Sequence, residues 1–197
     1  MADSNEHEVF LTIRAFIAID ISEAQRAAIG QTIEVFRQMR ADVKWVRPEN
    51  LHITLKFLGD INEESIDTIA QKLSELSANH WAFQVELKTI GAFPNLKRPN
   101  ALWIGITKTT ALEALHRGIE EGMSTAGFKK EDRPFTPHLT IARVKGMRDY
   151  HGLYEKLKAL SDKDFGVCDT AEIVLMKSDL MPGGAKYMRL KSFPFGK

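Results

Sequence analysis

His52-Ile53-Thr54-Leu55 and His138-Leu139-Thr140-Ile141 are two copies of one pattern, in which His and Thr alternate with apolar residues. Side chains of a β-strand point alternately to its two faces. Each copy therefore predicts a strand that turns His and Thr toward one face and its apolar residues toward the core. Two such strands, far apart in the chain, suggest two histidines that serve one site.

The repeat extends beyond these four residues. Arg47-Pro48 precedes the first copy at the same spacing at which Arg133-Pro134 precedes the second, and the offset between the copies is 138 − 52 = 86 residues. The same offset relates further segments of similar character. It places the apolar run 16–19 on 102–105 and, approximately, the helix-like segments 22–40 and 63–77 on 110–126 and 149–160. It places the strand-like run 83–87 on 169–173, where the apolar run 171–176 begins.

Each half of the chain thus has the pattern strand, helix, His-x-Thr strand, helix, strand. Ser22 with Gln25, and Thr110 with Glu113, match the capping box that begins a helix, and Gly127 suits the end of the second one. Further strands are expected near residues 101–107 and 186–191. Mixed elements with hairpin-like turns favour an α+β fold. We predict two pseudo-symmetric lobes, with mainly antiparallel sheets flanking a central cleft and helices outside.

Composition limits the choice of protein class. With 197 residues, 44% of them hydrophobic, the chain can bury a substantial core. No linker-like stretch divides it, so we expect one two-lobed domain over residues 12–197 after a loose polar tail at 1–11. The tail lacks the features of a signal peptide, and no apolar run has transmembrane length. A cytoplasmic protein is expected.

Charge and cysteine content narrow the partners. The net charge of +1 argues against a protein that coats long nucleic acid, but leaves room for a local basic cleft. Cys168 is the only cysteine, which excludes a disulfide framework and a cysteine-based metal site. No His-x-His or His-Glu-x-x-His spacing occurs, and neither strand motif contains a carboxylate. No metal or other cofactor is expected.

The paired motifs fit acid–base chemistry at phosphorus. A neutral histidine accepts a proton and a protonated one donates it, and both forms are accessible near pH 7. His52 and His138 could divide these tasks, and the hydroxyls of Thr54 and Thr140 could bond the phosphoryl oxygens. Phosphoryl transfer depends mainly on positioning and charge stabilisation. Residues alone do not say which histidine is the acid.

Other residues near the motifs are candidates for substrate contact. Lys56 has the parity of His52 and Thr54, and Arg14 lies on the first strand. Strict alternation turns Arg143 away from His138, unless a bulge restores it. Phe93 could stack on a base or be buried in a turn. Structural readings also remain open for two loop cations, which could cap or neutralise their loops: Arg47 and Arg133.

The segments around these motifs resemble a known group of proteins. They are 14–19, 50–59, 91–103 and 137–143. Together they are similar to the 2H phosphoesterase superfamily and, within it, to the RNA 2′,3′-cyclic phosphodiesterase branch, also described as 2′-5′ RNA ligase-like. The resemblance covers the chain from about residue 12 to residue 191.

The resemblance implies an activity that needs no metal. It is hydrolysis of a terminal 2′,3′-cyclic phosphate of RNA to a 2′-phosphate, with His52 as proton donor to the 3′ oxygen and His138 as proton acceptor from water. Family members also join RNA ends through 2′-5′ linkages. The expected partner is RNA with a cyclic phosphate end or a nucleoside cyclic phosphate, with no membrane and no obligatory protein partner.

Two alternatives stay open at this point. A binding module would hold RNA ends or nucleotides without converting them, although binding alone needs no matched acid and base. A related phosphodiesterase would act instead on 2′-5′ oligoadenylate or on small cyclic nucleotides. Substrate preference lies in the loops around a cleft, which sequence patterns describe poorly.

Overall fold

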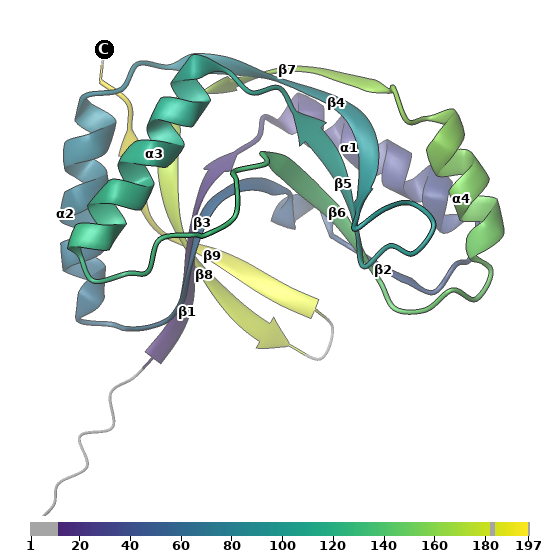
Figure 1. Ribbon diagram of the computed structural model, residues 1–197, viewed down its shortest axis with the longest axis horizontal. Coiled ribbons are helices and arrows are strands. Elements are labelled where there is room, and N and C mark those ends of the chain that lie inside the picture. Colours follow the sequence, from purple (N-terminus) through teal and green to yellow (C-terminus); the bar gives the residue numbers. More distant parts are fainter. Residues whose placement is uncertain (1–11, 182–183, 197) are drawn as a thin grey trace, which may run out of the picture.

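The computed structural model describes residues 12–181 and 184–196, so the tail predicted at 1–11 lies outside the described residues. The helices are interspersed among the strands along the chain (Figure 1). Their order is β1(Thr12–Asp20), α1(Glu23–Arg37), β2(Val43–Trp45), the 3-10 turn η1(Pro48–Asn50), β3(His52–Asn62), α2(Ser65–Ala78), β4(Phe83–Phe93), β5(Ala101–Ile106), α3(Thr110–Thr125), β6(His138–Val144), α4(Tyr150–Ala159), β7(Asp164–Thr170), β8(Glu172–Met181) and β9(Gly184–Pro194).

Two antiparallel sheets carry the predicted repeat. One has the strand order β3-β1-β8-β9 and the other β2-β6-β5-β4-β7. Apart from β2, the strands correspond one to one: the motif strands β3 and β6 each pair with the first strand of their own half, β1 or β5. The last strands cross over, because β4 of the first half joins the second sheet and β8 of the second half joins the first. The predicted α+β fold with two pseudo-symmetric lobes is confirmed.

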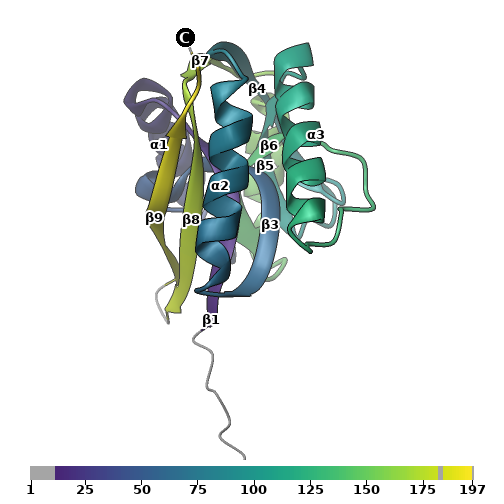
Figure 2. The same ribbon diagram turned by 90° about the vertical axis from the view of Figure 1, so that its left-hand side faces the viewer.

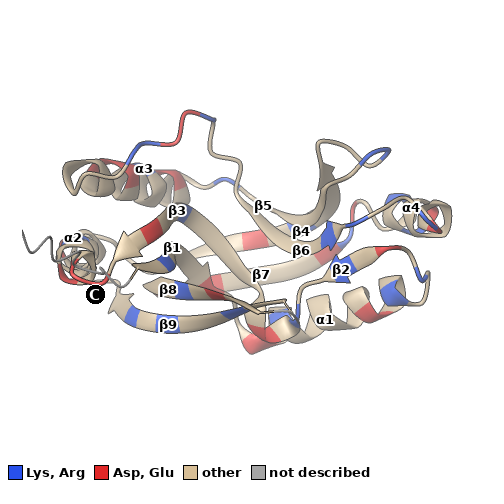
Figure 3. Ribbon diagram, turned by 90° about the horizontal axis from the view of Figure 1, so that it is seen from below, with Lys and Arg blue, Asp and Glu red and all other residues tan. Residues whose placement is uncertain are grey.

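The helices lie on the outer sides of the sheets. α2 packs on β3, β8 and β9 and runs beside α3, which also touches β3 (Figure 2). α1 packs against β7, and α4 lies at the same end of the molecule (Figures 1 and 3). Ile53, Leu55, Leu139 and Ile141 of the two motifs are all buried in the core, as the alternation predicts. No helix among the described residues is long and apolar enough to cross a membrane.

The two motif strands contain bulges at equivalent positions. Opposite β1, Thr54 pairs with Ala18 and Lys56 with Ile17, so Leu55 is an extra residue. Opposite β5, Thr140 pairs with Trp103 and Ala142 with Leu102, so Ile141 is extra. A bulge reverses the facing of the residues that follow it. Because Leu55 and Ile141 differ by the 86-residue offset, the bulges belong to the repeat.

Helix ends follow the predicted signals with one correction. The Ser22 hydroxyl accepts a hydrogen bond from Gln25 N, as expected for a capping residue. The cap of α3 is Thr109, not Thr110: its Oγ1 accepts a hydrogen bond from Leu112 N at 3.1 Å. Because Thr109 and Thr110 are consecutive, the sequence alone does not decide which of them caps the helix. Gly127, with φ +90, terminates this helix as predicted.

Candidate active site

A cleft opens where the two motif strands approach each other. β3 of one sheet packs against β6 of the other, so the strands of the two His-x-Thr motifs are neighbours in space. The cleft has a volume of about 550 Å³, and β3 lines it with His52 and Thr54, while β6 contributes Thr140 and Arg143. The hairpin of β8 and β9 forms a further wall and supplies Tyr187. The predicted cleft between two lobes is therefore present.

Both histidine rings are held in the same way by their own strand. Nδ1 of His52 lies 2.8 Å from the carbonyl oxygen of Asn50, and Nδ1 of His138 lies 2.8 Å from that of Thr136. A carbonyl oxygen only accepts, so each Nδ1 carries the hydrogen and donates it. Nε2 is then the nitrogen left for chemistry in both rings. The repeat thus presents two equivalent bases.

Aromatic side chains pack around each imidazole. Phe16 lies 4.7 Å from His52 and the Tyr187 ring 5.1 Å from it, measured between ring centroids. The rings of Phe93 and His138 are nearly perpendicular, with their centroids 4.9 Å apart. Burial lowers the pKa of both histidines below the ordinary 6.5. Both rings are therefore mostly neutral at pH 7 in the free protein.

Charges of both signs lie beside His52, whereas the charge beside His138 is positive. After burial, which lowers its pKa most, the backbone bond to Asn50 and the Asp20 carboxylate raise the pKa of His52, whereas Arg26 and His138 lower it. For His138, burial is again the largest cause, the bond to Thr136 raises the pKa, and Arg143 lowers it. A nearby anion therefore favours the charged form of His52, and a nearby cation favours the neutral form of His138.

The loop before His52 is fixed by hydrogen bonds. The Arg26 guanidinium donates to the carbonyl oxygens of Pro48 at 2.6 Å and Leu51 at 3.2 Å, and it pairs with Asp20. The Asn50 side chain donates to the Ala185 carbonyl at 2.8 Å, which ties this loop to the β8–β9 hairpin. In the motif itself, the Thr54 hydroxyl lies 3.0 Å from Nε2 of His52. A neutral His52 accepts this hydroxyl proton when no substrate is present.

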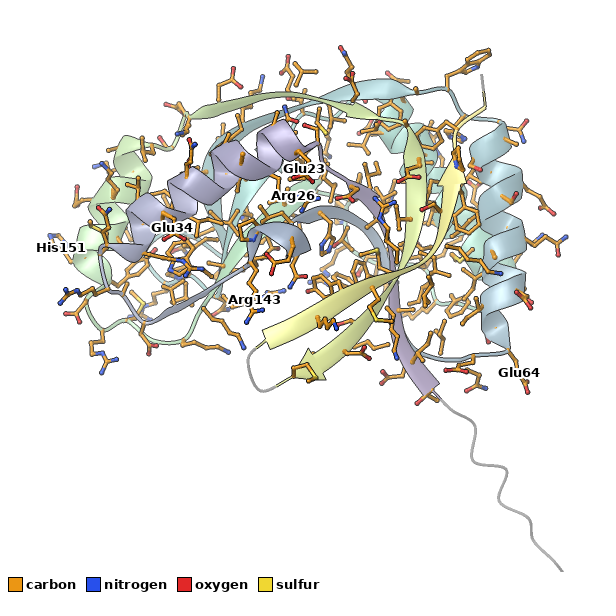
Figure 4. The ribbon with its side chains drawn as sticks, turned by 180° about the vertical axis from the view of Figure 1, so that it is seen from behind. Glu23, Arg26, Glu34, Glu64, Arg143 and His151 are labelled. Atoms are coloured by element: carbon orange, nitrogen blue, oxygen red, sulfur yellow. The ribbon has the colours of Figure 1, made fainter. Side chains whose placement is uncertain are left out.

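Positive charge is concentrated in the cleft although the whole chain carries only +1. Its described lining contains no carboxylate and includes five cations: Arg14, Arg37, Lys44, Arg47 and Arg143. Figure 3 shows basic positions along β2 and the end of β6, and Figure 4 labels Arg143 beside the β8–β9 hairpin. Within the described residues, only Arg37 of these five forms an ion pair. Such a cleft suits a phosphate-bearing ligand.

Comparisons with known proteins identify the family. The sequence profile of the 2′-5′ RNA ligase superfamily matches residues 24–180. The chain belongs to this superfamily. A relative from Methanocaldococcus jannaschii, named RNA 2′,3′-cyclic phosphodiesterase, is 37% identical over 92% of this chain and 100% of its own length. A relative of the same name from Methanothermobacter thermautotrophicus is 32% identical over 93% of this chain and 99% of its own length. The resemblance stated from the motifs is confirmed.

Two solved structures have the same fold. The protein TT0787 of Thermus thermophilus matches with a TM-score of 0.76 at 26% identity, over 94% of this chain and all of that one. E. coli LigT, solved in complex with 3′-AMP, matches with a TM-score of 0.75 at 22% identity, over 95% of this chain and all of that one. The fold shared with these structures therefore extends over nearly the whole chain.

The β6 bulge decides the position of Arg143. Without it, alternation would turn this residue away from His138. Because Ile141 is the extra residue, Ala142 turns into the core and Arg143 enters the cleft. Arg47, for which both readings were open, also lines the cleft. Arg133 does not: it forms an ion pair with Glu131, and its side chain is 84% exposed.

The expectation that Lys56 faces the cleft is wrong. The β3 bulge at Leu55 turns Lys56 to the core side of the sheet, where it is only 6% exposed. Its ammonium lies 2.8 Å from the Glu120 carboxylate and donates to the Lys129 carbonyl at 2.9 Å. Lys56 thus links α3 and the following loop to β3, and its role is structural.

Phe93 and Arg14 are placed near the site, at different points. Phe93 is the last residue of β4 rather than part of a turn, and its ring packs on both His138 and Trp103. It is 37% exposed, so part of the ring remains available to a ligand. Arg14, on β1, lines the cleft directly.

The sequence reading missed three kinds of cleft residue. Phe57 enters the cleft because of the β3 bulge, at the position that corresponds to Arg143 in the repeat. Tyr187 comes from the last strand, which has no motif of its own. Arg37 lies at the end of α1, and Lys44 lies on the short strand β2, whose pairing with β6 brings Lys44 to the site. Of these residues, only Arg37 could have been suspected from the sequence, because it lies near the end of the helix predicted at 22–40.

Among the described residues, no three His, Cys, Asp or Glu side chains lie close enough together to hold a metal ion. The described site brings together two imidazoles, hydroxyls and cations. That set supplies an acid, a base and charge stabilisation.

Proposed function

We propose that this chain is an RNA 2′,3′-cyclic phosphodiesterase, which hydrolyses a terminal 2′,3′-cyclic phosphate to a 2′-phosphate. The observation that carries the proposal is the pair of histidines on neighbouring strands, each anchored through Nδ1 and each with Nε2 left for proton transfer. The names of the relatives support the same activity. Two further statements remain predictions from the sequence: the protein is cytoplasmic, and its activity needs no protein partner.

The reaction needs one proton accepted and one donated. Neutral His138 accepts a proton through Nε2 from a water molecule, whose oxygen attacks the phosphorus. The bond from phosphorus to the 3′ oxygen breaks, and the protonated Nε2 of His52 gives its proton to that oxygen. The products are a 2′-phosphate and a free 3′-hydroxyl, and solvent returns the proton from His138 to His52.

The surroundings of the histidines support this division of roles. Asp20 favours the protonated form of His52, and Arg143 favours the neutral form of His138. Thr54, Thr140 and Arg143 are proposed to bond the non-bridging oxygens, with Arg14 adding positive charge to the cleft. Fixed donors of this kind stabilise the charge that develops on phosphorus oxygens during the reaction.

Phe57 is proposed to stack on the terminal base. It is an unusually exposed aromatic residue, 67% accessible, and it lines the cleft next to Phe16. Stacking on an aromatic side chain contributes about 1–3 kcal/mol per base. Phe57→Ala is therefore expected to raise KM about 5- to 150-fold while changing kcat much less. Phe57→Tyr should retain most of the affinity, and a large fall in kcat for Phe57→Ala at unchanged KM would argue against stacking.

The pH dependence of kcat/KM follows from the two histidines. The reactive form of the free enzyme has His52 protonated and His138 neutral. Because burial lowers both pKa values below 6.5, this form is scarce at pH 7 and becomes more abundant as the pH falls. At still lower pH His138 becomes protonated and the rate falls. A bell-shaped profile with its maximum below pH 6.5 is expected in phosphate-free buffer, and a maximum above pH 7 would contradict it.

The direct test is turnover of cyclic-phosphate-ended RNA in the presence of EDTA, with the product identified. A 2′-phosphate is expected, and a 3′-phosphate or strict dependence on added metal would overturn the mechanism. Affinity without any product at high protein concentration would favour a binding module. A substrate panel that includes 2′-5′ oligoadenylate and RNA ends offered for 2′-5′ joining separates the remaining alternatives.

A further inference from the structure

One end of the cleft carries more positive charge than a single cyclic phosphate requires. Arg37 lies in the last turn of α1, Lys44 on β2 and Arg47 on the loop after β2. These three residues, called the β2 strip, line the same cleft as His52. A terminal cyclic phosphate carries one negative charge, for which Arg143 and the two threonines are already proposed as partners. The strip therefore offers positive charge that the hydrolysis step does not use.

The strip adjoins the reaction centre through Arg143. In the antiparallel pairing of β2 with β6, Lys44 lies directly opposite Arg143. Directly opposite residues point their side chains to the same face, about 5 Å apart. Like charges in this position destabilise a sheet, and no described carboxylate in the cleft offsets them. An anion bound between the two side chains would remove this repulsion.

The β8–β9 hairpin closes the other side of the strip. A Cβ atom added to Gly184 would lie 3.5 Å from Nζ of Lys44, so the ammonium lies close to the hairpin backbone. The Asn50 amide holds the neighbouring Ala185 carbonyl at 2.8 Å. The β2 strip, His52 and the hairpin residues Ser178 and Leu180 thus line one cleft. A cleft that carries several cations suits a ligand with more than one phosphate.

We propose that the β2 strip binds the phosphodiester that precedes the terminal nucleotide of RNA, so that the enzyme prefers an oligonucleotide over a single nucleoside cyclic phosphate. The inference rests on the proposed function and adds a second phosphate subsite to it. Lys44 bridges the two subsites, because it lies beside both Arg143 and the hairpin. Arg37 and Arg47 extend the positive charge along the strand backbone.

The first test compares kcat/KM for an RNA pentamer with a 2′,3′-cyclic phosphate end and for cytidine 2′,3′-cyclic phosphate. The wild-type protein is expected to favour the pentamer at least tenfold. Lys44→Ala should reduce kcat/KM for the pentamer about tenfold, the low end for a hydrogen bond to a charged group, and should affect the mononucleotide less. The matched control is Lys108→Ala, because Lys108 is exposed and lies outside the cleft.

The second test measures binding of the product pentamer, which ends in a 2′-phosphate, at several salt concentrations. For single strands, the slope of log K against log salt changes by about 0.7 for each phosphate contact. Lys44→Ala should lower that slope by about this amount, and Lys108→Ala should leave it unchanged.

The outcomes separate the subsite from the proposed function. Equal kcat/KM for both substrates in the wild-type protein, or an equal loss on both in Lys44→Ala, would overturn the subsite while leaving the phosphodiesterase intact. Absence of turnover with either substrate would instead overturn the proposed function. Preference for the pentamer that survives Lys44→Ala, Arg37→Ala and Arg47→Ala would place the second phosphate elsewhere.

Discussion

Replacing His52 or His138 with glutamine is expected to lower kcat/KM for a cyclic-phosphate end by about 10²–10⁴-fold. Glutamine keeps a polar side chain but can neither accept nor release a proton near neutral pH. Each replacement should also remove one limb of the bell-shaped pH profile: the His138 variant the acidic limb, and the His52 variant the basic limb. Steady-state kinetics between about pH 4.5 and pH 8 measure both effects.

His151→Gln is the matched control for these variants. His151 lies exposed on α4, far from Arg143 and the cleft (Figure 4), so its replacement should leave kcat/KM unchanged. The double variant of His52 and His138 should be little worse than either single one, because an acid and a base that act together fail together. Additive losses, or turnover that survives both replacements, would contradict the two-histidine mechanism.

The position of the acid–base pair could be predicted because it depends on local rules. Alternation along a strand sets the facing of His52 and Thr54, and the repeated offset indicates that His138 and Thr140 lie in an equivalent strand. Alternation fails two residues after Thr54, where the bulge moves Lys56 into the core and Phe57 into the cleft. No local sequence pattern marks that bulge, since Leu55 and Lys56 are ordinary strand residues.

The remaining cleft residues depend on long-range pairing. Tyr187 reaches His52 only because β9 joins β8, and β8 joins β1 of the other half. Lys44 reaches Arg143 only through the three-residue strand β2. Such pairings are set by the packing of the whole chain, and a short strand has little signal of its own. The charges around His52 likewise could not be predicted from the sequence, because Asp20 is 32 residues away from His52 along the chain.

Lys56 and Glu120 form a buried ion pair. Breaking it should lower the free energy of unfolding more than any other substitution proposed for this protein. Both side chains are buried, and the Lys56 ammonium lies 2.8 Å from both carboxylate oxygens of Glu120. Glu120 also accepts a hydrogen bond from Glu131 N at 3.1 Å, in the loop that leads to His138. The pair therefore connects β3, α3 and the approach to the second motif.

Glu120→Ala is expected to destabilise the protein by about 3–5 kcal/mol, because it leaves the Lys56 charge buried without its partner. In a protein of this size that corresponds to a fall in Tm of roughly 6–20 °C. Lys56→Met combined with Glu120→Leu removes both charges and keeps similar volumes, so it should recover most of the lost stability. Thermal unfolding of the two variants separates the possibilities: equal destabilisation would mean that packing, or the bond to Glu131, matters more than the unpaired charge. Since neither side chain lines the cleft, kcat/KM of the folded double variant should stay within a few-fold of wild type, in contrast to the histidine variants.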